Sequence, residues 1–200
     1  MIRQLPYWCF LVLWVTITLL GFVLPVYASL NLPLFDLRHC IFTGSLLLGI
    51  LQWFVLRQKL RQTVWWIPVT AIGGVLCLWL GFVLSTVFLF AGALPLQLRL
   101  GLGFAVSGAL LGCGQYFVLR RYRQAQLLIA IDSLAASTSL PGFMLIHLFA
   151  STVFFDNPTI PQDSDWLRAA MVGGIVAGTI QGAGLLWVLK QGQRSARSAA

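Results

Sequence analysis

One acidic side chain lies well inside an apolar stretch of this chain, and three amides lie in other apolar stretches. Asp132 stands about one and a half helical turns inside an apolar run that begins near residue 127. Gln52, Gln115 and Gln181 each lie toward the end of a glycine-rich apolar run. In a membrane, a carboxylate is costly and typical of ion or substrate sites, whereas amides bond to neighbouring helices. These residues therefore predict a polar site within the membrane, hydrogen bonding between helices, or both.

Each of these polar residues also has a purely structural interpretation. Asp132 could form an ion pair with Arg121 or Arg123, or interact with the amino-terminal end of its helix. The three glutamines either cross-link helices or form a ring that lines a polar site. His147, near the outer end of the same run, could ligate a metal or pigment together with His39, or simply bond at a helix end.

Small polar and helix-breaking residues interrupt the run that carries Asp132. They are Ser137, Thr138, Ser139, Pro141 and Gly142. A broken helix can line a substrate site in a transporter. Alternatively, the interruption is a kink at which Ser and Thr satisfy the freed carbonyl groups.

Catalytic signatures are absent from the sequence. It contains no Gly-x-Ser-x-Gly, His-Glu-x-x-His, phosphate-binding loop or Cys-x-x-Cys motif. The cysteines lie in or beside separate apolar runs, which predicts helix packing rather than metal binding. They are Cys9, Cys40, Cys77 and Cys113. We therefore predict no catalytic residues, no metal and no cofactor, in a protein that is not an enzyme.

The composition places these residues in a membrane. Of the 200 residues, 59% are hydrophobic and 9% are charged, whereas a soluble domain carries about 25% charged residues. The formal charge of +8 does not indicate nucleic-acid binding, because the basic residues cluster at the ends of apolar runs. At those positions they predict contact with anionic lipid headgroups.

Six continuous apolar runs predict an all-α integral membrane bundle, because about 20 apolar residues in a helix cross a bilayer. The predicted spans cover residues 7–28, 40–56, 64–91, 96–119, 127–152 and 168–189 of one domain, 1–192, followed by a short basic tail, 193–200. The first span could instead be a signal peptide cleaved after Ala28, which would leave five helices.

Positive charge sets the predicted orientation. Ten of the thirteen Lys and Arg residues fall on one side of the six spans: Arg3, Arg57, Lys59, Arg61, Arg120, Arg121, Arg123, Lys190, Arg194 and Arg197. Short loops rich in these residues remain in the cytoplasm, so both termini should be cytoplasmic. Aromatic residues beside the clusters, among them Trp8, Trp65 and Trp66, predict an interfacial belt.

An internal repeat relates the spans. Residues 47–57 and 110–120 share eight of eleven aligned residues. A third copy, 173–190, is weaker: Gln181 lies nine residues before its basic residue, against five in the other copies, so two registers remain open. The spans alternate as three related helix pairs, which predicts a pseudo-threefold bundle about the membrane normal.

Small residues recur four apart in the glutamine-bearing runs, so each pair occupies one helix face. The pairs are Ser45/Gly49, Gly108/Gly112, Gly174/Gly178 and Gly178/Gly182. Small side chains let helix backbones approach closely, which drives association in lipid. We therefore predict Gly49, Gly112, Gly178 and Gly182 at helix–helix contacts.

The segments Gly-x-x-Gln-Trp-Phe-Val-Leu-Arg at 49–57 and Gly-x-x-Gln-Tyr-Phe-Val-Leu-Arg at 112–120 resemble repeats in a group of uncharacterised bacterial polytopic membrane proteins, associated mainly with photosynthetic bacteria. The resemblance covers residues 44–74 and 107–137. The second copy departs from it at 128–131, where the first copy has aromatic residues. The resemblance implies a plasma or thylakoid membrane location and supplies no activity.

Two functions from different classes follow. The glycine faces, the scarce intramembrane charge and the short loops favour a non-enzymatic scaffold or accessory subunit, with lipid and other membrane subunits as partners. The alternative is a small transporter or channel that uses Asp132 and the glutamine-bearing helices. An enzyme acting on lipid ranks last, because no set of catalytic groups supports it.

Overall fold

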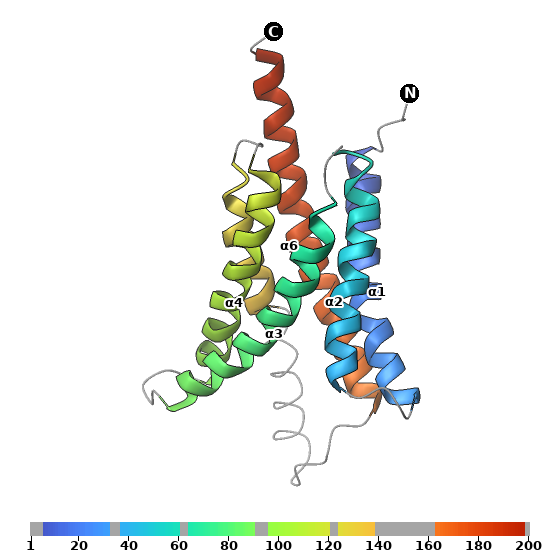
Figure 1. Cartoon of the computed structure of the whole chain (residues 1–200), viewed down its shortest axis with the longest axis vertical. Helices are drawn as coiled ribbons and strands as arrows, with labels where there is room; N and C mark the ends of the chain where they lie inside the picture. The colour runs from blue at the N-terminus through green and yellow to red at the C-terminus, as the bar shows by residue number, and fades with distance from the viewer. Residues whose placement is uncertain are drawn as a thin grey trace.

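The computed structural model describes residues 6–32, 37–60, 64–90, 96–120, 124–138 and 163–198. Every regular element in these ranges is a helix, which confirms the all-α prediction (Figure 1). The helices are α1 (Tyr7–Asn31), α2 (Leu37–Leu56), α3 (Trp66–Phe90), α4 (Leu96–Leu119), a short helix (Leu127–Thr138) and α6 (Asp163–Ser198). We call Leu127–Thr138 the short helix.

Three of the described helices are long and apolar enough to cross a membrane. The segments concerned are Tyr7–Ala28, Leu102–Leu119 and Ala170–Gln191. The apolar parts of the other helices are shorter within the described residues: Phe42–Leu56, Trp66–Gly81 and Leu127–Thr138. A helix bonds its own backbone groups, so such sequences can be accommodated in lipid. By helix length and composition, the chain is a multi-pass integral membrane protein.

The helix boundaries lie close to those of the predicted spans. α4 covers the predicted residues, and α2 ends at Leu56 as predicted. α6 is longer than its predicted span at both ends, since it begins at Asp163 and continues to Ser198. The basic segment predicted as a tail is therefore helical as far as Ser198. Most of the fifth predicted span, 139–152, lies outside the described residues.

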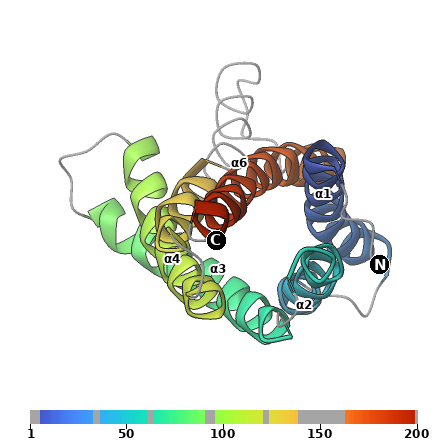
Figure 2. The ribbon, with the colours of Figure 1, turned by 90° about the horizontal axis from the view of Figure 1, so that it is seen from above.

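The helices form a ring in which neighbours along the chain pack side by side (Figure 2). α1 contacts α2, α2 contacts α3 and α3 contacts α4, and α6 closes the ring by packing along α1. The short helix contacts both α4 and α6, through Gly112 and Gly184. α1 begins, and α2, α4 and α6 end, at the same end of the bundle (Figure 1). We call it the basic end, because Arg57, Lys59 and Arg120 occupy the turns there.

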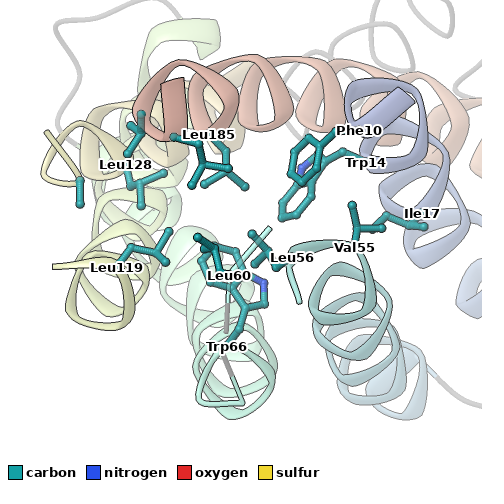
Figure 3. Close-up of a cluster of buried hydrophobic side chains, with 13 residues drawn as sticks. Phe10, Trp14, Ile17, Val55, Leu56, Leu60, Trp66, Leu119, Leu128 and Leu185 are labelled. Carbon is teal, nitrogen blue, oxygen red and sulfur yellow. The ribbon is translucent and has the colours of Figure 1, made fainter. Parts of the chain in front are cut away.

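Apolar side chains from all six helices meet inside the ring near the basic end (Figure 3). The buried members of this apolar cluster are Phe10, Trp14, Ile17, Val55, Leu56, Leu60, Trp66, Leu119, Ala125, Leu128, Leu185, Val188 and Leu189. Trp14 stacks on Phe10 with ring centroids 5.6 Å apart and meets Trp66 edge to face at 6.1 Å. Side chains thus occupy the interior at this level.

The outward faces of the helices are apolar as well. On α3, an exposed stripe at helical spacing consists of Ile72, Leu76, Trp79, Val83 and Val87. Contiguous apolar surface of this kind is unusual on a soluble monomer, whereas lipid solvates it. An apolar exterior around a packed interior is the arrangement expected of a bundle embedded in a bilayer.

Candidate polar site inside the bundle

Six polar side chains each lie about one helical turn deeper in the bundle than a member of the apolar cluster, on the side away from the basic end. Each stands four residues from a cluster member, on the same face of its helix. The pairs are Trp14/Thr18, Leu56/Gln52, Trp66/Thr70, Leu119/Gln115, Leu128/Asp132 and Leu185/Gln181. Four residues rise about 6 Å along a helix. We call Thr18, Gln52, Thr70, Gln115, Asp132 and Gln181 the polar layer.

Within this layer, α2 is bonded to both of its neighbours through one glutamine. The Trp66 indole Nε1 donates to Gln52 Oε1 at 3.1 Å, and Gln52 Nε2 donates to Thr18 Oγ1 at 3.5 Å. All three side chains are buried. Interhelical hydrogen bonds in membrane proteins contribute about 0.6 kcal/mol each on average. We call Thr18, Gln52 and Trp66 the threonine site.

On the opposite side of the ring, α6 is bonded to the short helix through an amide and a carboxyl group. Gln181 Nε2 donates to Asp132 Oδ1 at 2.7 Å, and Asp132 is only 1% exposed. The other carboxyl oxygen, Oδ2, is buried and has no hydrogen-bond partner among the described residues. We call Asp132 and Gln181 the aspartate site.

Trp14 of α1 packs on α6 beside the aspartate site. A β-carbon built on Gly182, the residue after Gln181, would lie 2.9 Å from Trp14 Cδ1. The Trp14 side chain is 1% exposed, and its Nε1 has no hydrogen-bond partner within the described part of the chain. Within the residues that the structure describes, two buried polar atoms at or beside the aspartate site thus lack a hydrogen bond, whereas each of the three side chains of the threonine site is bonded.

Gln115 of α4, the remaining glutamine of the polar layer, is 3% exposed. Thr70 on neighbouring α3 is 2% exposed, and its Oγ1 has no hydrogen bond among the residues that the structure describes.

Glycines bring the glutamine-bearing helices close to the backbone of their neighbours. A β-carbon built on each would crowd a backbone atom of the next helix: Gly49 with Ile67 O at 2.9 Å, Gly112 with Ile129 Cα at 2.6 Å, and Gly178 with Val15 Cα at 3.0 Å. Gly182 instead faces the side chains of Leu11 and Trp14. Any larger residue at the first three positions would push the helices apart.

Weaker donors connect α3, α4 and the short helix. The Cys77 thiol of α3 donates to Ser107 Oγ of α4 at 3.4 Å, and Ser107 Oγ donates to the Phe104 carbonyl at 2.9 Å. Ser133, next to Asp132, donates to the Ala105 carbonyl at 2.8 Å. The Cys77 bond thus joins α3 to α4, and the Ser133 bond joins the short helix to α4.

Several predicted candidates lie outside the described residues. His147, Arg121 and Arg123 are among them, as is the side chain of His39. The predicted ion pairs of Asp132 therefore stay predictions, and the partner that the structure gives Asp132 is Gln181. Within the described ranges, no group of three or more His, Cys, Asp or Glu residues could hold a metal ion.

The interruption after the short helix is described only in part. The Ser137 and Thr138 hydroxyls both donate to the Leu134 carbonyl, at 2.9 and 2.7 Å. Hydroxyl bonding of this kind to backbone carbonyls is the role that the kink hypothesis gave them. Ser139, Pro141 and Gly142 lie outside the described residues.

The sequence does not single out the threonines of the polar layer, Thr18 and Thr70. Its prediction that Trp66 belongs to the interfacial belt is wrong, because the structure buries Trp66 at 1% exposure. Trp8 and Trp65, at 70% and 74% exposure, do lie on the surface. The available signal was the four-residue spacing from a tryptophan to each threonine.

No family model, curated protein or solved structure matches this chain. The functional argument consequently rests on the packing of the bundle and on the groups of the polar layer.

Proposed function

We propose that the chain is a six-span membrane protein built from three related helix pairs around a pseudo-threefold axis. The pairs are α1 with α2, α3 with α4, and the fifth span, which begins with the short helix, with α6. Two hydrogen bonds join the helices of a pair in the same way. Gln52 of α2 bonds to Thr18 of α1, and Gln181 of α6 bonds to Asp132 of the short helix.

Contacts between successive pairs follow one register, which supports this arrangement. Gly49, Gly112 and Gly178 each stand three residues before a glutamine and crowd the first helix of the next pair. Each of these glycines contacts a residue that precedes another member of the polar layer by three positions. Ile67 precedes Thr70, Ile129 precedes Asp132, and Val15 precedes Thr18. The third repeat copy is accordingly aligned on Gln181 rather than on Lys190.

Contacts inside the first two pairs agree with the same register. Gly21 and Gly73 each lie three residues after a threonine of the polar layer. Their β-carbon positions face Leu48 and Leu111, at 2.8 and 2.6 Å from the Cδ1 atoms, and each leucine precedes its glutamine by four residues. Equivalent residues in the two pairs therefore make equivalent contacts.

The basic end is proposed to face the cytoplasm, with both termini on that side. Arg57 and Arg120 directly follow α2 and α4, and Lys59 lies over the Tyr7 ring at 5.0 Å. Arg57 also lies over the rings of Trp53 and Phe54, at 5.1 and 4.5 Å. Cations beside exposed aromatic rings suit the headgroup region of an anionic leaflet, in a plasma or thylakoid membrane.

As the role of this bundle we propose a non-enzymatic scaffold or accessory subunit of a membrane complex. The observation that carries it is the use of the interior: apolar side chains occupy the level near the basic end, and most polar groups below it bond one helix to another. Such an interior supports rigid packing. The apolar outer faces are left for lipid and neighbouring subunits.

The experiment is chemical crosslinking in native membranes followed by purification in a mild detergent. We expect a stoichiometric crosslink to another integral membrane protein through an outer face such as that of Trp79. A tagged, unrelated six-span protein from the same membranes controls for random collisions. Extraction as a lone monomer, without crosslinks above the control, would contradict the scaffold role.

A transporter or channel is the second candidate, and one observation favours it: Asp132 Oδ2 is buried without a partner in the described residues. Its test is ion flux into liposomes that contain the purified chain, compared with Asp132→Asn. Equal flux in both proteins would remove Asp132 from any transport mechanism. Absence of flux above empty liposomes would remove the candidate.

A further inference from the structure

The polar layer contains one ionisable carboxyl group, at a position where the other two helix pairs carry threonine. Thr18, Thr70 and Asp132 each follow, by three residues, a residue whose backbone contacts a glycine of the neighbouring helix. Each of the three side chains is at most 2% exposed. A threonine hydroxyl is neutral and can be buried with a single hydrogen bond. A carboxylate at the same place brings a negative charge into the interior.

The surroundings of Asp132 provide little to balance that charge. Gln181 Nε2 donates to Oδ1, and Oδ2 has no donor among the described residues. Among the described residues, Gly108 of α4 lies against the Asp132 carbonyl oxygen. Within the same residues, Cys77 of α3 is the titratable group that interacts electrostatically with the carboxyl, and its thiol donates to Ser107 Oγ. A buried carboxylate with one unpaired oxygen is strongly disfavoured unless a positive charge neutralises it.

We infer that Asp132 binds a single small cation, a proton or a sodium ion, inside the bundle. The carboxyl Oδ2 receives the cation, while Gln181 holds Oδ1 and so fixes the orientation of the group. Gln181 forms its hydrogen bond through Nε2 alone among the described residues, which leaves its Oε1 as a second oxygen on α6. Oxygen is the ligand type that hard cations prefer. The inference goes beyond the proposed scaffold role and does not depend on any partner.

The site would link the occupancy of one carboxyl to the contact between two helices. α6 packs on α1 and on the short helix, and within the described residues its hydrogen bond to the short helix ends on Asp132. Loss of the cation would leave an uncompensated charge at that contact. Binding of the cation neutralises the Asp132 carboxylate, and we therefore expect it to strengthen the packing of α6 on the short helix.

The test is infrared spectroscopy of the purified full chain in vesicles of phosphatidylcholine at neutral pH, with choline as the sodium-free salt. If a proton is bound, the wild-type spectrum contains a protonated carboxyl C=O band in both salts. If sodium is bound, replacing choline by sodium shifts a carboxylate band. Whichever of these two bands is observed must be lost in the Asp132→Asn variant. The control variant Asp165→Asn, at the start of α6, must retain it.

Failure of the variant to fold would not leave the question open. The sodium-minus-choline difference spectrum needs only the wild-type chain, and Asp132→Thr substitutes the residue found at the equivalent positions of the other pairs. A carboxylate signal that is insensitive to sodium, without a protonated band at neutral pH, would overturn the inference. A lone monomer in the crosslinking experiment would instead contradict the scaffold role and leave this result unaffected.

Discussion

In the proposed arrangement of three helix pairs, the threonine site and the aspartate site occupy equivalent places in the first and third pairs, yet they satisfy their polar groups differently. In the first, Gln52 accepts from Trp66 and donates to Thr18, so all three side chains are bonded. In the second, Gln181 bonds only to Asp132, and both Trp14 Nε1 and Asp132 Oδ2 are buried without partners in the described chain.

The difference shows how one packing frame can carry two kinds of polar group. A glycine at a close helix contact is present in both places: Gly49 of α2 packs against α3, and Gly178 of α6 packs against α1. What changes is the residue at the threonine position. A neutral hydroxyl completes a network that joins helices, whereas a carboxyl adds an ionisable group that no described neighbour balances with a positive charge.

The largest expected effect comes from removing the glutamines. Gln181→Leu leaves the Asp132 carboxyl without any described partner and should lower the free energy of unfolding by about 3 kcal/mol, at the upper end for a buried unsatisfied group. Gln52→Leu removes two bonds of the threonine site and should cost about 1 kcal/mol. Denaturation of the purified chain in mixed micelles measures both.

The matched control for this comparison is the double variant Asp132→Asn with Gln181→Leu. Its cost should be smaller than the sum of the two single costs, because the two side chains interact. If Gln181→Leu and Gln52→Leu lower the free energy of unfolding equally, the Asp132 carboxyl does not depend on its bond to Gln181 more than the threonine site depends on Gln52.

A second comparison tests the glycine frame itself. Gly112→Ala places a methyl group 2.6 Å from Ile129 Cα, where only backbone movement can relieve the clash, and should destabilise the bundle by about 1–3 kcal/mol. Gly114, on the same helix, faces the end of the Val69 side chain, so Gly114→Ala should cost much less. Unfolding in mixed micelles again measures the difference, and equal costs would contradict close backbone contact at Gly112.

Much of the fold could be predicted because lipid imposes a simple rule on sequence. Apolar runs form helices that bond their own backbones, so the ranges of α2 and α4 follow from hydropathy and basic flanks. The ends of α6 could not be predicted in this way, because its first and last turns are polar and gain nothing from lipid. Helix propensity of residues such as Ala, Gln and Arg extends it there.

The candidate site could be predicted only in part. The sequence singled out Asp132 and the glutamines because polar groups are rare in apolar runs. It did not pair Gln181 with Asp132, because they are 49 residues apart and their approach depends on how α6 closes the ring. Trp66 was misassigned for a related reason: beside a basic turn, an inward-facing tryptophan and an interfacial one look alike in sequence.

A third experiment compares the two tryptophans. Trp66→Phe removes the donor to Gln52 Oε1 and should cost about 0.6 kcal/mol, while retaining most of the ring contacts. Trp14→Phe removes a buried N–H that has no partner within the described residues and should be close to neutral. The free energies of unfolding of the two variants give the answer. An equal loss in Trp14→Phe would mean that Trp14 bonds to a group at the aspartate site.

The smallest effect is expected at the threonines, where the comparison can be made within one residue type. Thr18 accepts a long hydrogen bond of 3.5 Å from Gln52, so Thr18→Val should cost about 0.5 kcal/mol, below the average for such bonds. Thr70 is equally buried but has no described partner for its hydroxyl, so Thr70→Val should be neutral or slightly stabilising, since it removes an unpaired polar atom. Valine has nearly the same shape as threonine, so unfolding of the two variants reports the hydroxyl groups alone. A loss at Thr70 as large as that at Thr18 would show that Gln115 bonds to Thr70, and the second helix pair would then carry the same amide–hydroxyl contact as the first.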